Sequence, residues 1–160
     1  MAEERFTTRV AVFVIVRNDK GEILLHQRAP GRYLAGYWDF PSGHGERDES
    51  LVQSAVRELK EEVDLDGRVE DLRLVHIEQY FVEVNYLNFV FALDKWSGTP
   101  RICEPDKCSA IGWFAPDALP EKCVNAVQAA AMSGFTDQLT YSITDRKTYE
   151  QTMGLPKQAA

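Results

Sequence analysis

Three glutamates within residues 43–65 have the spacing that brings side chains together on a helix. Glu58, Glu61 and Glu62 stand at positions i, i+3 and i+4, which share one helical face. Carboxylates this close repel one another and raise one another's pKa unless a cation lies among them. Carboxylate oxygens suit hard divalent ions such as Mg2+ or Mn2+. The pattern therefore predicts a divalent-cation site, and the alternative is a solvated acidic helix face.

The apolar residues of the same predicted helix place these glutamates beside the protein core. At about 100° per residue, the apolar positions form one continuous arc next to the glutamates. They are Leu51, Val52, Ala55, Val56, Leu59 and Val63. A solvated acidic face points away from the buried stripe, whereas a metal site needs acids beside a wall that excludes water. We expect the helix to span about 50–63, with Ser50 and Gln53 forming a capping box at its start.

The spacing of polar residues around the glutamates resembles the Nudix box, G-x5-E-x7-R-E-U-x-E-E-x-G-U, where U is a bulky aliphatic residue. Gly43 and Glu49 are separated by five residues, and seven more separate Glu49 from the run Arg-Glu-Leu-Lys-Glu-Glu at 57–62. One position departs, because Asp64 stands where the box has its second glycine. That glycine usually ends the helix in a left-handed conformation, which Asp adopts with less strain than most residues. The departure concerns the end of the helix and not the acids.

The resemblance implies a fold and an activity. The fold is α/β, a Nudix-type α/β/α sandwich with a mixed sheet. The activity is Mg2+- or Mn2+-dependent hydrolysis of a nucleoside diphosphate linked to another group, X. The implied partner is a small phosphorylated molecule, a nucleotide, and many relatives pair as homodimers. The compact chain length favours a nucleoside triphosphate pyrophosphatase within this class.

The resemblance also implies roles for residues of the box. The metal ligands would be the three glutamates and the backbone carbonyl of Gly43, and one glutamate would act as general base. Arg57 and Glu49 would pair, locking the loop against the helix and orienting the acids. A purely structural ion pair is the alternative for both. The implied catalytic residues are Glu58, Glu61, Glu62 and Arg57.

Further candidates lie outside the box or at its edge, and each has a structural alternative. Arg28 could bind phosphate through its guanidinium fork, or be an exposed surface arginine. Tyr33 could stack on a base, and so could Trp38, although a tryptophan in a strand more often belongs to the core. His44 could approach the metal or the phosphate, or shape its loop. Glu104 could add an acid near the metal, as Nudix enzymes often do, or be an exposed loop acid.

Strands are expected before and after the central helix. The predicted strands are 7–16, 22–27, 38–40, 72–78, 80–84, 86–93 and 110–114. A turn at 18–21 predicts that the first two form a hairpin, and the loop at 29–37 is predicted to face a ligand. A second helix is predicted at 121–132. We expect one domain at 1–134 and a C-terminal tail at 135–160 that is mobile or binds a partner.

Composition and charge limit the classes of function. A chain of 160 residues is long enough for one domain with a sizeable core. A net charge of -7 argues against binding polymeric nucleic acid, which needs basic patches. His26 and His76 fall in predicted strands and are expected to be structural. Three cysteines without framework spacing, and no apolar leader or membrane-spanning run, predict a soluble cytoplasmic protein with reduced thiols and no membrane partner.

Two hypotheses from different classes follow. The first is a metal-dependent nucleoside diphosphate-X hydrolase, favoured because the chain keeps the acids of the box. The second is a module on the same fold that binds a nucleotide or nucleotide sugar without turnover. Isomerisation of an isoprenoid diphosphate is a weaker third hypothesis, because the cysteine-bearing motif which that chemistry needs has no counterpart before the box.

Overall fold

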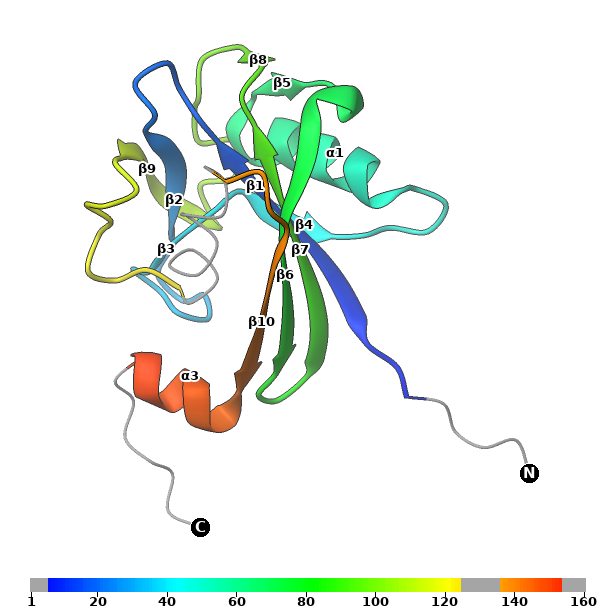
Figure 1. Cartoon of the computed structure of the whole chain (residues 1–160). Coiled ribbons are helices and arrows are strands. Elements are labelled where there is room, and N and C mark those ends of the chain that lie inside the picture. The colour runs from blue at the N-terminus through cyan, green and yellow to red at the C-terminus, as the bar shows by residue number, and fades with distance from the viewer. Residues whose placement is uncertain (1–5, 125–135, 154–160) are drawn as a thin grey trace.

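The computed structural model describes residues 6–124 and 136–153 and is built around a five-stranded mixed sheet (Figure 1). The strand order is β10-β6-β7-β1-β4. The strands are β1 (Arg9–Val16), β4 (Ser42–His44), β6 (Leu72–Phe81), β7 (Asn85–Leu93) and β10 (Thr140–Asp145). Two neighbouring pairs, β1 with β7 and β10 with β6, are parallel, and the other two are antiparallel. The predicted α/β fold with a mixed sheet is therefore confirmed.

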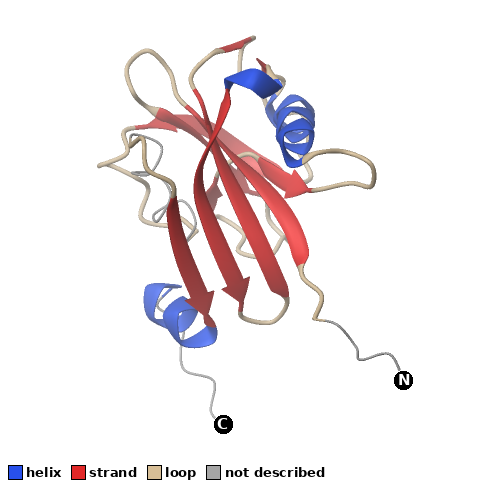
Figure 2. Ribbon diagram, turned by 45° about the vertical axis from the view of Figure 1, so that its right-hand side comes forward, coloured by secondary structure: helices blue, strands red, loops and turns tan. Residues whose placement is uncertain are grey.

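A second, three-stranded sheet packs against one side of the central sheet. Its order is β3-β2-β9, and its strands are β2 (Ile23–Arg28), β3 (Trp38–Asp39) and β9 (Cys108–Phe114). A short ladder joins β5 (Asp66–Gly67) to β8 (Trp96–Ser97). The helices are α1 (Leu51–Val63), the 3-10 turn η1 (Val69–Asp71) and α3 (Arg146–Met153). Figure 2 shows α1 lying across one end of the central sheet and α3 beside the far end of its edge strand.

Two apolar clusters form the core, one on each side of the central sheet. Alternate residues of β7 supply both, as a half-buried strand with a period of two requires. Phe89, Phe91 and Leu93 pack with the helix-side cluster, whereas Val90 and Ala92 pack with the cluster under the second sheet. The predicted strand at 86–93 therefore contributes one face to each cluster. The central sheet is thus covered on both faces at the end where α1 lies.

The ends of α1 follow the sequence prediction closely. The capping box is present, and the backbone N–H of Ser50 donates to Oε1 of Gln53 at 2.8 Å. At the other end, Asp64 is left-handed with φ 57° and ψ 33°, and its N–H donates to the carbonyl of Lys60 at 3.1 Å. The Asp64 carboxylate pairs with Lys60 at 2.8 Å and with Arg101 at 2.7 Å, which lowers its pKa to about 2. Asp64 therefore ends the helix in the conformation expected of the glycine it replaces.

Two predictions about the strands were wrong. The first two strands do not form a hairpin, because β1 and β2 lie in different sheets and only a single bridge joins Arg17 to Ile23. The turn between them redirects the chain from one sheet to the other. The two strands predicted within residues 72–84 are one strand, β6, in which Gln79 continues the ladder opposite Leu87. A polar side chain does not interrupt the ladder, because the ladder's hydrogen bonds are made by backbone groups.

Residues 140–153, which fall within the predicted C-terminal tail, form the regular elements β10 and α3. The sequence did not indicate the strand β10 because its exposed residues are apolar and its inward residue is polar. Tyr141 and Ile143 are 57% and 50% exposed, whereas Thr144 is 4% exposed and faces inward. The second predicted helix does not begin at residue 121, because residues 121–124 are not helical and Cys123 bridges Trp38. The remainder of that prediction lies outside the described residues.

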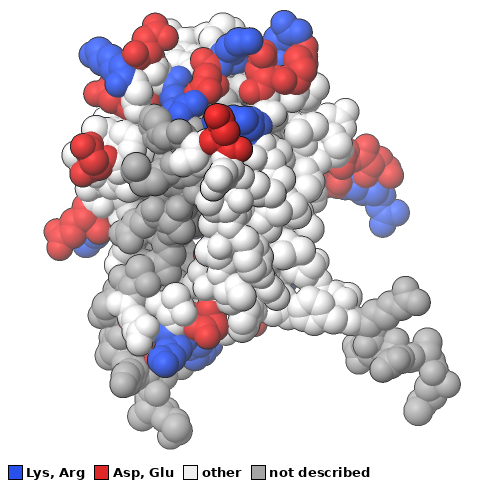
Figure 3. Space-filling view, in the orientation of Figure 1, with Lys and Arg blue, Asp and Glu red and all other residues white. Residues whose placement is uncertain are grey.

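The surface separates charged from uncharged regions. Figure 3 shows charged side chains gathered toward the end of the molecule that holds α1, β5 and β8, and few over the middle of this face. Exposed apolar side chains include Leu139, Tyr141 and Ile143. Within residues 6–124 and 136–153, no helix has the length and apolar character needed to cross a membrane.

Candidate active site

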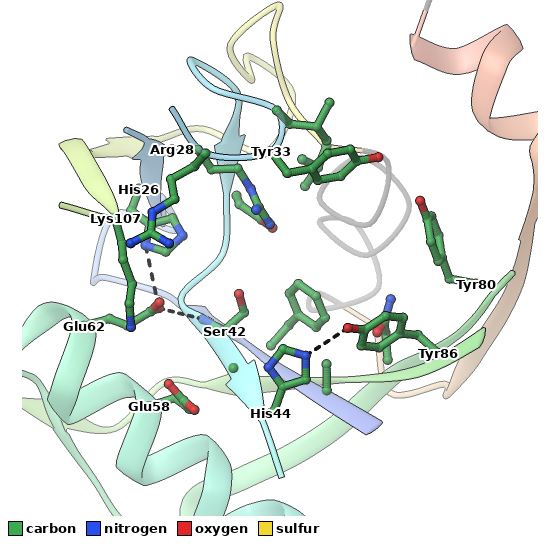
Figure 4. A pocket seen from close by; sticks show the side chains of 18 of the residues that line it. His26, Arg28, Tyr33, Ser42, His44, Glu58, Glu62, Tyr80, Tyr86 and Lys107 are labelled. Atoms are coloured by element: carbon green, nitrogen blue, oxygen red, sulfur yellow. Dashed lines mark hydrogen bonds and ion pairs between the residues drawn. The ribbon is translucent and has the colours of Figure 1, made fainter. Parts of the chain in front are cut away.

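A cavity of about 750 Å3 opens between the two sheets and has chemically different ends (Figure 4). At one end, Glu58 and Glu62 face Arg28 and Lys107. At the other end, Tyr80 and Tyr86 project from the central sheet. Anionic and cationic groups at one end, with aromatic rings at the other, match a ligand that has a phosphate group and a flat ring.

Glu58 lies against the backbone of Gly43, so a side chain at position 43 would displace its carboxylate. A Cβ atom added at Gly43 would lie 1.9 Å from Cδ of Glu58, which no pair of carbon atoms tolerates. The Glu58 side chain is 14% exposed, and burial raises the pKa of its carboxyl. The first position of the motif thus makes room for the first acid of its helix.

Glu62 is about as buried as Glu58, with its side chain 12% exposed. It accepts a hydrogen bond from the backbone N–H of Ser42 at 2.8 Å, and Nδ1 of His26 lies 3.7 Å away. Burial, reinforced by repulsion from Glu58 and Asp39, raises the pKa of Glu62 to about 8. Burial and the nearby Arg28 lower the pKa of His26 to about 4, so this imidazole is neutral at pH 7. The neutral imidazole of His26 therefore contributes no positive charge beside the Glu62 carboxyl.

Arg57 connects the loop of the motif to its helix. Its Nη2 donates to Glu49 at 2.7 Å and to the carbonyl of His44 at 3.0 Å. Its Nη1 donates to Glu58 at 2.9 Å and to Glu61 at 3.2 Å. The hydrogen bonds from Arg57 and Ser54 lower the pKa of Glu49 to about 2. The structure thus shows the pair that the motif implies and places a guanidinium between two of the three glutamates.

The carboxylate oxygens of Glu58 and Glu62 are chemically suited to bind a hard divalent cation. Glu58 and Glu62 offer only oxygen, and burial is the main cause that raises the pKa of both carboxyls, so a cation beside them would favour their charged form. In the described residues, however, no three His, Cys, Asp or Glu side chains already form a ligand cluster. Glu61 is 55% exposed and engaged by Arg57. Nη1 of Arg57 contacts one oxygen of Glu58 and one of Glu61, so the other oxygen of each carboxylate could still bind an ion.

The other sequence candidates are divided between the pocket and its margin. Arg28 lines the pocket and is held by Asp39 at 2.6 Å, while its Nε is buried without a hydrogen-bond partner among the described residues. His44 and Tyr33 also line the pocket. Nε2 of His44 lies 3.0 Å from the Tyr86 hydroxyl. Glu104 does not line the pocket and pairs with Lys107, which does, at 2.7 Å.

Several pocket residues were missed at the sequence level. They are Glu78, Tyr80, Tyr86, Asn88, Lys107 and Tyr149. Tyr149 comes from α3 and bonds through its hydroxyl to that of Tyr33, so the C-terminal segment forms part of the wall. A signal was present at Asn88, because this polar residue shares the alternate positions of Val90 and Ala92 and so lies on an inward face of its strand.

The chain is similar to known proteins over most of its length. A family model described as NUDIX domain matches residues 7–135. Over 86 residues, 54% of this chain, it is 31% identical to the 8-oxo-dGTP diphosphatase of Escherichia coli (strain K12) and spans 66% of that protein's length. Over 106 residues, 66% of this chain, it is 32% identical to the CTP pyrophosphohydrolase of the same strain, covering 75% of it. The crystal structure of a MutT NUDIX hydrolase from Burkholderia pseudomallei aligns with a TM-score of 0.73 and 29% identity, covering 80% of this chain and 98% of that one.

Proposed function

Because the chain belongs to the NUDIX family, we propose that it hydrolyses the pyrophosphate bond of a nucleoside diphosphate linked to another group. The observation that carries this proposal is the pocket end at which Glu58 and Glu62 face Arg28 and Lys107. Buried acids with raised pKa values attract cations, and the two basic side chains across the pocket attract phosphate. A phosphate chain bound together with a cation would satisfy both the acids and the basic side chains.

Members of the family generally use divalent metal cations, and we propose Mg2+ or Mn2+ here. The residues that would hold the ion are Glu58, Glu61, Glu62 and the carbonyl of Gly43. A divalent cation supplies charge neutralisation to phosphate oxygens and makes water easier to deprotonate. The chain's own contribution is to keep these acids in place and to exclude bulk water from one side of them, through the packing of Leu59 and Val63 in the core.

Arg57 and Glu49 act as positioning residues in this proposal. Glu49 takes two hydrogen bonds from the Arg57 guanidinium, which also holds the carbonyl of His44. The loop before α1 is thereby tied to the helix that carries the acids. Arg28, anchored by buried Asp39, would bind phosphate oxygens through the part of its guanidinium that faces the pocket.

We propose a nucleotide as substrate, a nucleoside triphosphate in particular. The tyrosine end of the pocket offers flat rings of the kind on which a base stacks, since Tyr80 lies near both Tyr86 and Tyr149. The names of the relatives also point to nucleoside triphosphates, an oxidised guanine nucleotide for one and CTP for another. The predicted homodimer and the predicted cytoplasmic location stay predictions.

The test is hydrolysis of a nucleotide panel with Mg2+ or Mn2+ by the wild-type chain and by Glu62→Gln. The panel comprises nucleoside triphosphates, oxidised nucleotides, ADP-ribose, dinucleoside polyphosphates and nucleotide sugars. We expect one preferred substrate and a loss of at least about 100-fold in kcat/KM for the variant. Glu70→Gln, which changes an acid that is 54% exposed and does not line the pocket, serves as the matched control.

Equal rates for wild type and Glu62→Gln on every substrate would reject the site assignment. Binding of a nucleotide with no product under any cation would instead support the second hypothesis, a binding module without turnover.

A further inference from the structure

The tyrosine end of the pocket contains a buried carboxylate that the phosphate chemistry does not use. Glu78 of β6 is 2% exposed and lines the pocket. Nδ2 of Asn88 donates to its Oε2 at 2.7 Å, and the hydroxyl of Thr144 donates to its Oε1 at 2.5 Å. The three residues come from β6, β7 and β10, so the group is held from both neighbouring strands.

The hydrogen bonds around Glu78 decide what it can still bind. Both carboxylate oxygens accept, so the group presents acceptors only. An ionised carboxylate has about four lone-pair sites, of which Asn88 and Thr144 occupy two. One site remains on each oxygen. A carboxylate with one free site on each oxygen matches a partner that carries two adjacent N–H donors, in the manner of a fork.

Among the common bases, guanine has two adjacent donors on its Watson–Crick edge, N1–H and N2–H2. Cytosine and adenine each offer one amino donor beside a ring nitrogen that accepts, and that nitrogen would face a carboxylate oxygen. Uracil and thymine offer one N–H between two carbonyl oxygens. A buried acceptor that stays unpaired is costly, so the mismatched bases are disfavoured by more than the lost hydrogen bond alone.

Resting on the proposed nucleotide hydrolysis and on the two acceptor sites that residues 6–124 and 136–153 leave open on this carboxylate, we propose that Glu78 selects a guanine-type base by accepting hydrogen bonds from N1–H and N2–H2. Asn88 and Thr144 are positioning residues that hold the carboxylate. Tyr80 and Tyr86, whose ring centroids lie 6.5 Å apart, supply the aromatic surroundings of the base. Guanine and 8-oxoguanine share this donor pair, because oxidation at C8 leaves the Watson–Crick edge unchanged.

The C-terminal segment completes this subsite. The family model ends at residue 135, whereas Thr144 and Tyr149 lie beyond it. Thr144 reaches Glu78 because β10 pairs in parallel with β6, and Tyr149 reaches Tyr33 from α3. The segment that the sequence suggested was a tail therefore supplies both a contact to the specificity residue and part of the pocket wall.

The experiment is calorimetric binding of dGMP, dIMP, dCMP and dAMP, with Mg2+ present, to the full chain. Hypoxanthine in dIMP keeps N1–H and lacks the N2 amino group, so it removes one of the two donors. We expect wild type to bind dGMP about tenfold or more tightly than dIMP, and dCMP and dAMP no better than dIMP. Glu78→Gln should lose most of the dGMP preference over dIMP.

Two further variants separate recognition from folding. Thr144→Val removes one hydrogen bond to the carboxylate and should reduce the dGMP preference by several-fold while dCMP binding changes little. Glu83→Gln, at an acid 74% exposed after the end of β6, should change nothing. Were the network purely structural, both pocket variants would weaken every nucleotide equally. The dGMP to dIMP ratio of the wild type tests the proposal even if Glu78→Gln fails to fold.

Equal binding of dGMP and dIMP, a preference for dCMP or dAMP, or no measurable binding of any of them would overturn the assignment. Binding of 8-oxo-dGMP, measured in parallel, identifies whether the oxidised or the unmodified base is preferred. Hydrolysis of GTP, ITP and CTP tests the proposed function separately. Turnover without a base preference leaves the hydrolase and removes the guanine site, whereas selective dGMP binding without turnover leaves the guanine site and removes the hydrolase.

Discussion

The two ends of the pocket are built in opposite ways. The acids of one end come from one contiguous stretch, in which Gly43, Glu49, Arg57, Glu58 and Glu62 lie within twenty residues of sequence, while Arg28 and Lys107 face them from β2 and from the loop before β9. The tyrosine end draws on a loop, three strands and a C-terminal helix that are separated by as many as 116 positions, as for Tyr33 and Tyr149. The acid end therefore depends on helix geometry, and the tyrosine end on the assembly of sheets.

The comparison predicts different consequences for local changes at each end. At the acid end, one substitution disturbs several groups that share a helix and its loop. At the other end, each side chain is held by its own strand, so single changes should affect substrate affinity by smaller factors. The largest effect is expected for a change at Gly43 and the smallest for a change at Asp64.

Gly43→Ala should nearly abolish activity. The new Cβ would lie 1.9 Å from Cδ of Glu58, so the acid or its backbone must move. We expect kcat to fall by about 100-fold, since small displacements of positioned groups have effects of this size. Gly45→Ala is the matched control, because its nearest neighbour, Oγ of Ser54, is 3.8 Å away. Similar kinetics for the two variants would contradict the packing of Gly43 on Glu58.

Glu62→Gln should stabilise the metal-free chain above about pH 6 while it removes activity. The carboxyl has an ordinary pKa of 4.5 and a folded-state pKa of about 8. Between these values the folded chain holds a proton that the unfolded chain has released, so its free energy of unfolding falls as pH rises. Over this window the wild type should lose on the order of a few kcal/mol relative to the variant.

Thermal unfolding in EDTA at several pH values measures this difference. Added Mn2+ should raise the Tm of the wild type at pH 8 and leave Glu62→Gln nearly unchanged, because ligand binding to the folded state is stabilising. Parallel pH profiles for the two proteins would show that the pKa of Glu62 is not raised in the folded chain.

Tyr149→Phe should have a modest effect confined to substrate affinity. The variant loses the hydroxyl contact to Tyr33 and keeps the buried ring. A net hydrogen bond contributes about 0.5–1.5 kcal/mol, which corresponds to a KM increase of about two- to twelvefold with kcat retained. Tyr141→Phe, on the exposed side of β10, is the control and should leave KM unchanged. A fall in kcat without a change in KM would place α3 in the chemistry rather than in binding.

Asp64→Gly should have the smallest effect. Glycine relieves the left-handed conformation of Asp64, but it removes the contacts to Lys60 and Arg101. These opposing changes should leave the free energy of unfolding within about 1 kcal/mol of wild type. Thermal unfolding and kcat/KM measure the outcome. A tenfold change in kcat/KM would show that this corner of the helix influences the acid end.

The sequence by itself determined the acid end and the helix that carries it. The limits of α1, its capping box and the left-handed Asp64 follow from spacings of a few residues, and the contact between Arg57 and Glu49 follows from the resemblance to the Nudix box. Interactions at i, i+3 and i+4 depend on helix geometry alone, so they can be predicted without the rest of the chain. The two faces of β7 followed for the same reason, from a period of two.

Only the tertiary structure decided which strands meet. It placed β1 and β2 in different sheets, paired β10 with β6, and brought Thr144 to Glu78 across 66 positions of sequence. The strand β10 is apolar outside and polar inside, so its pattern resembled an exposed segment until His76 and Glu78 were found to be its partners. Strand pairing depends on long-range contacts that local periodicity does not contain, and the tyrosine end of the pocket is made of such contacts.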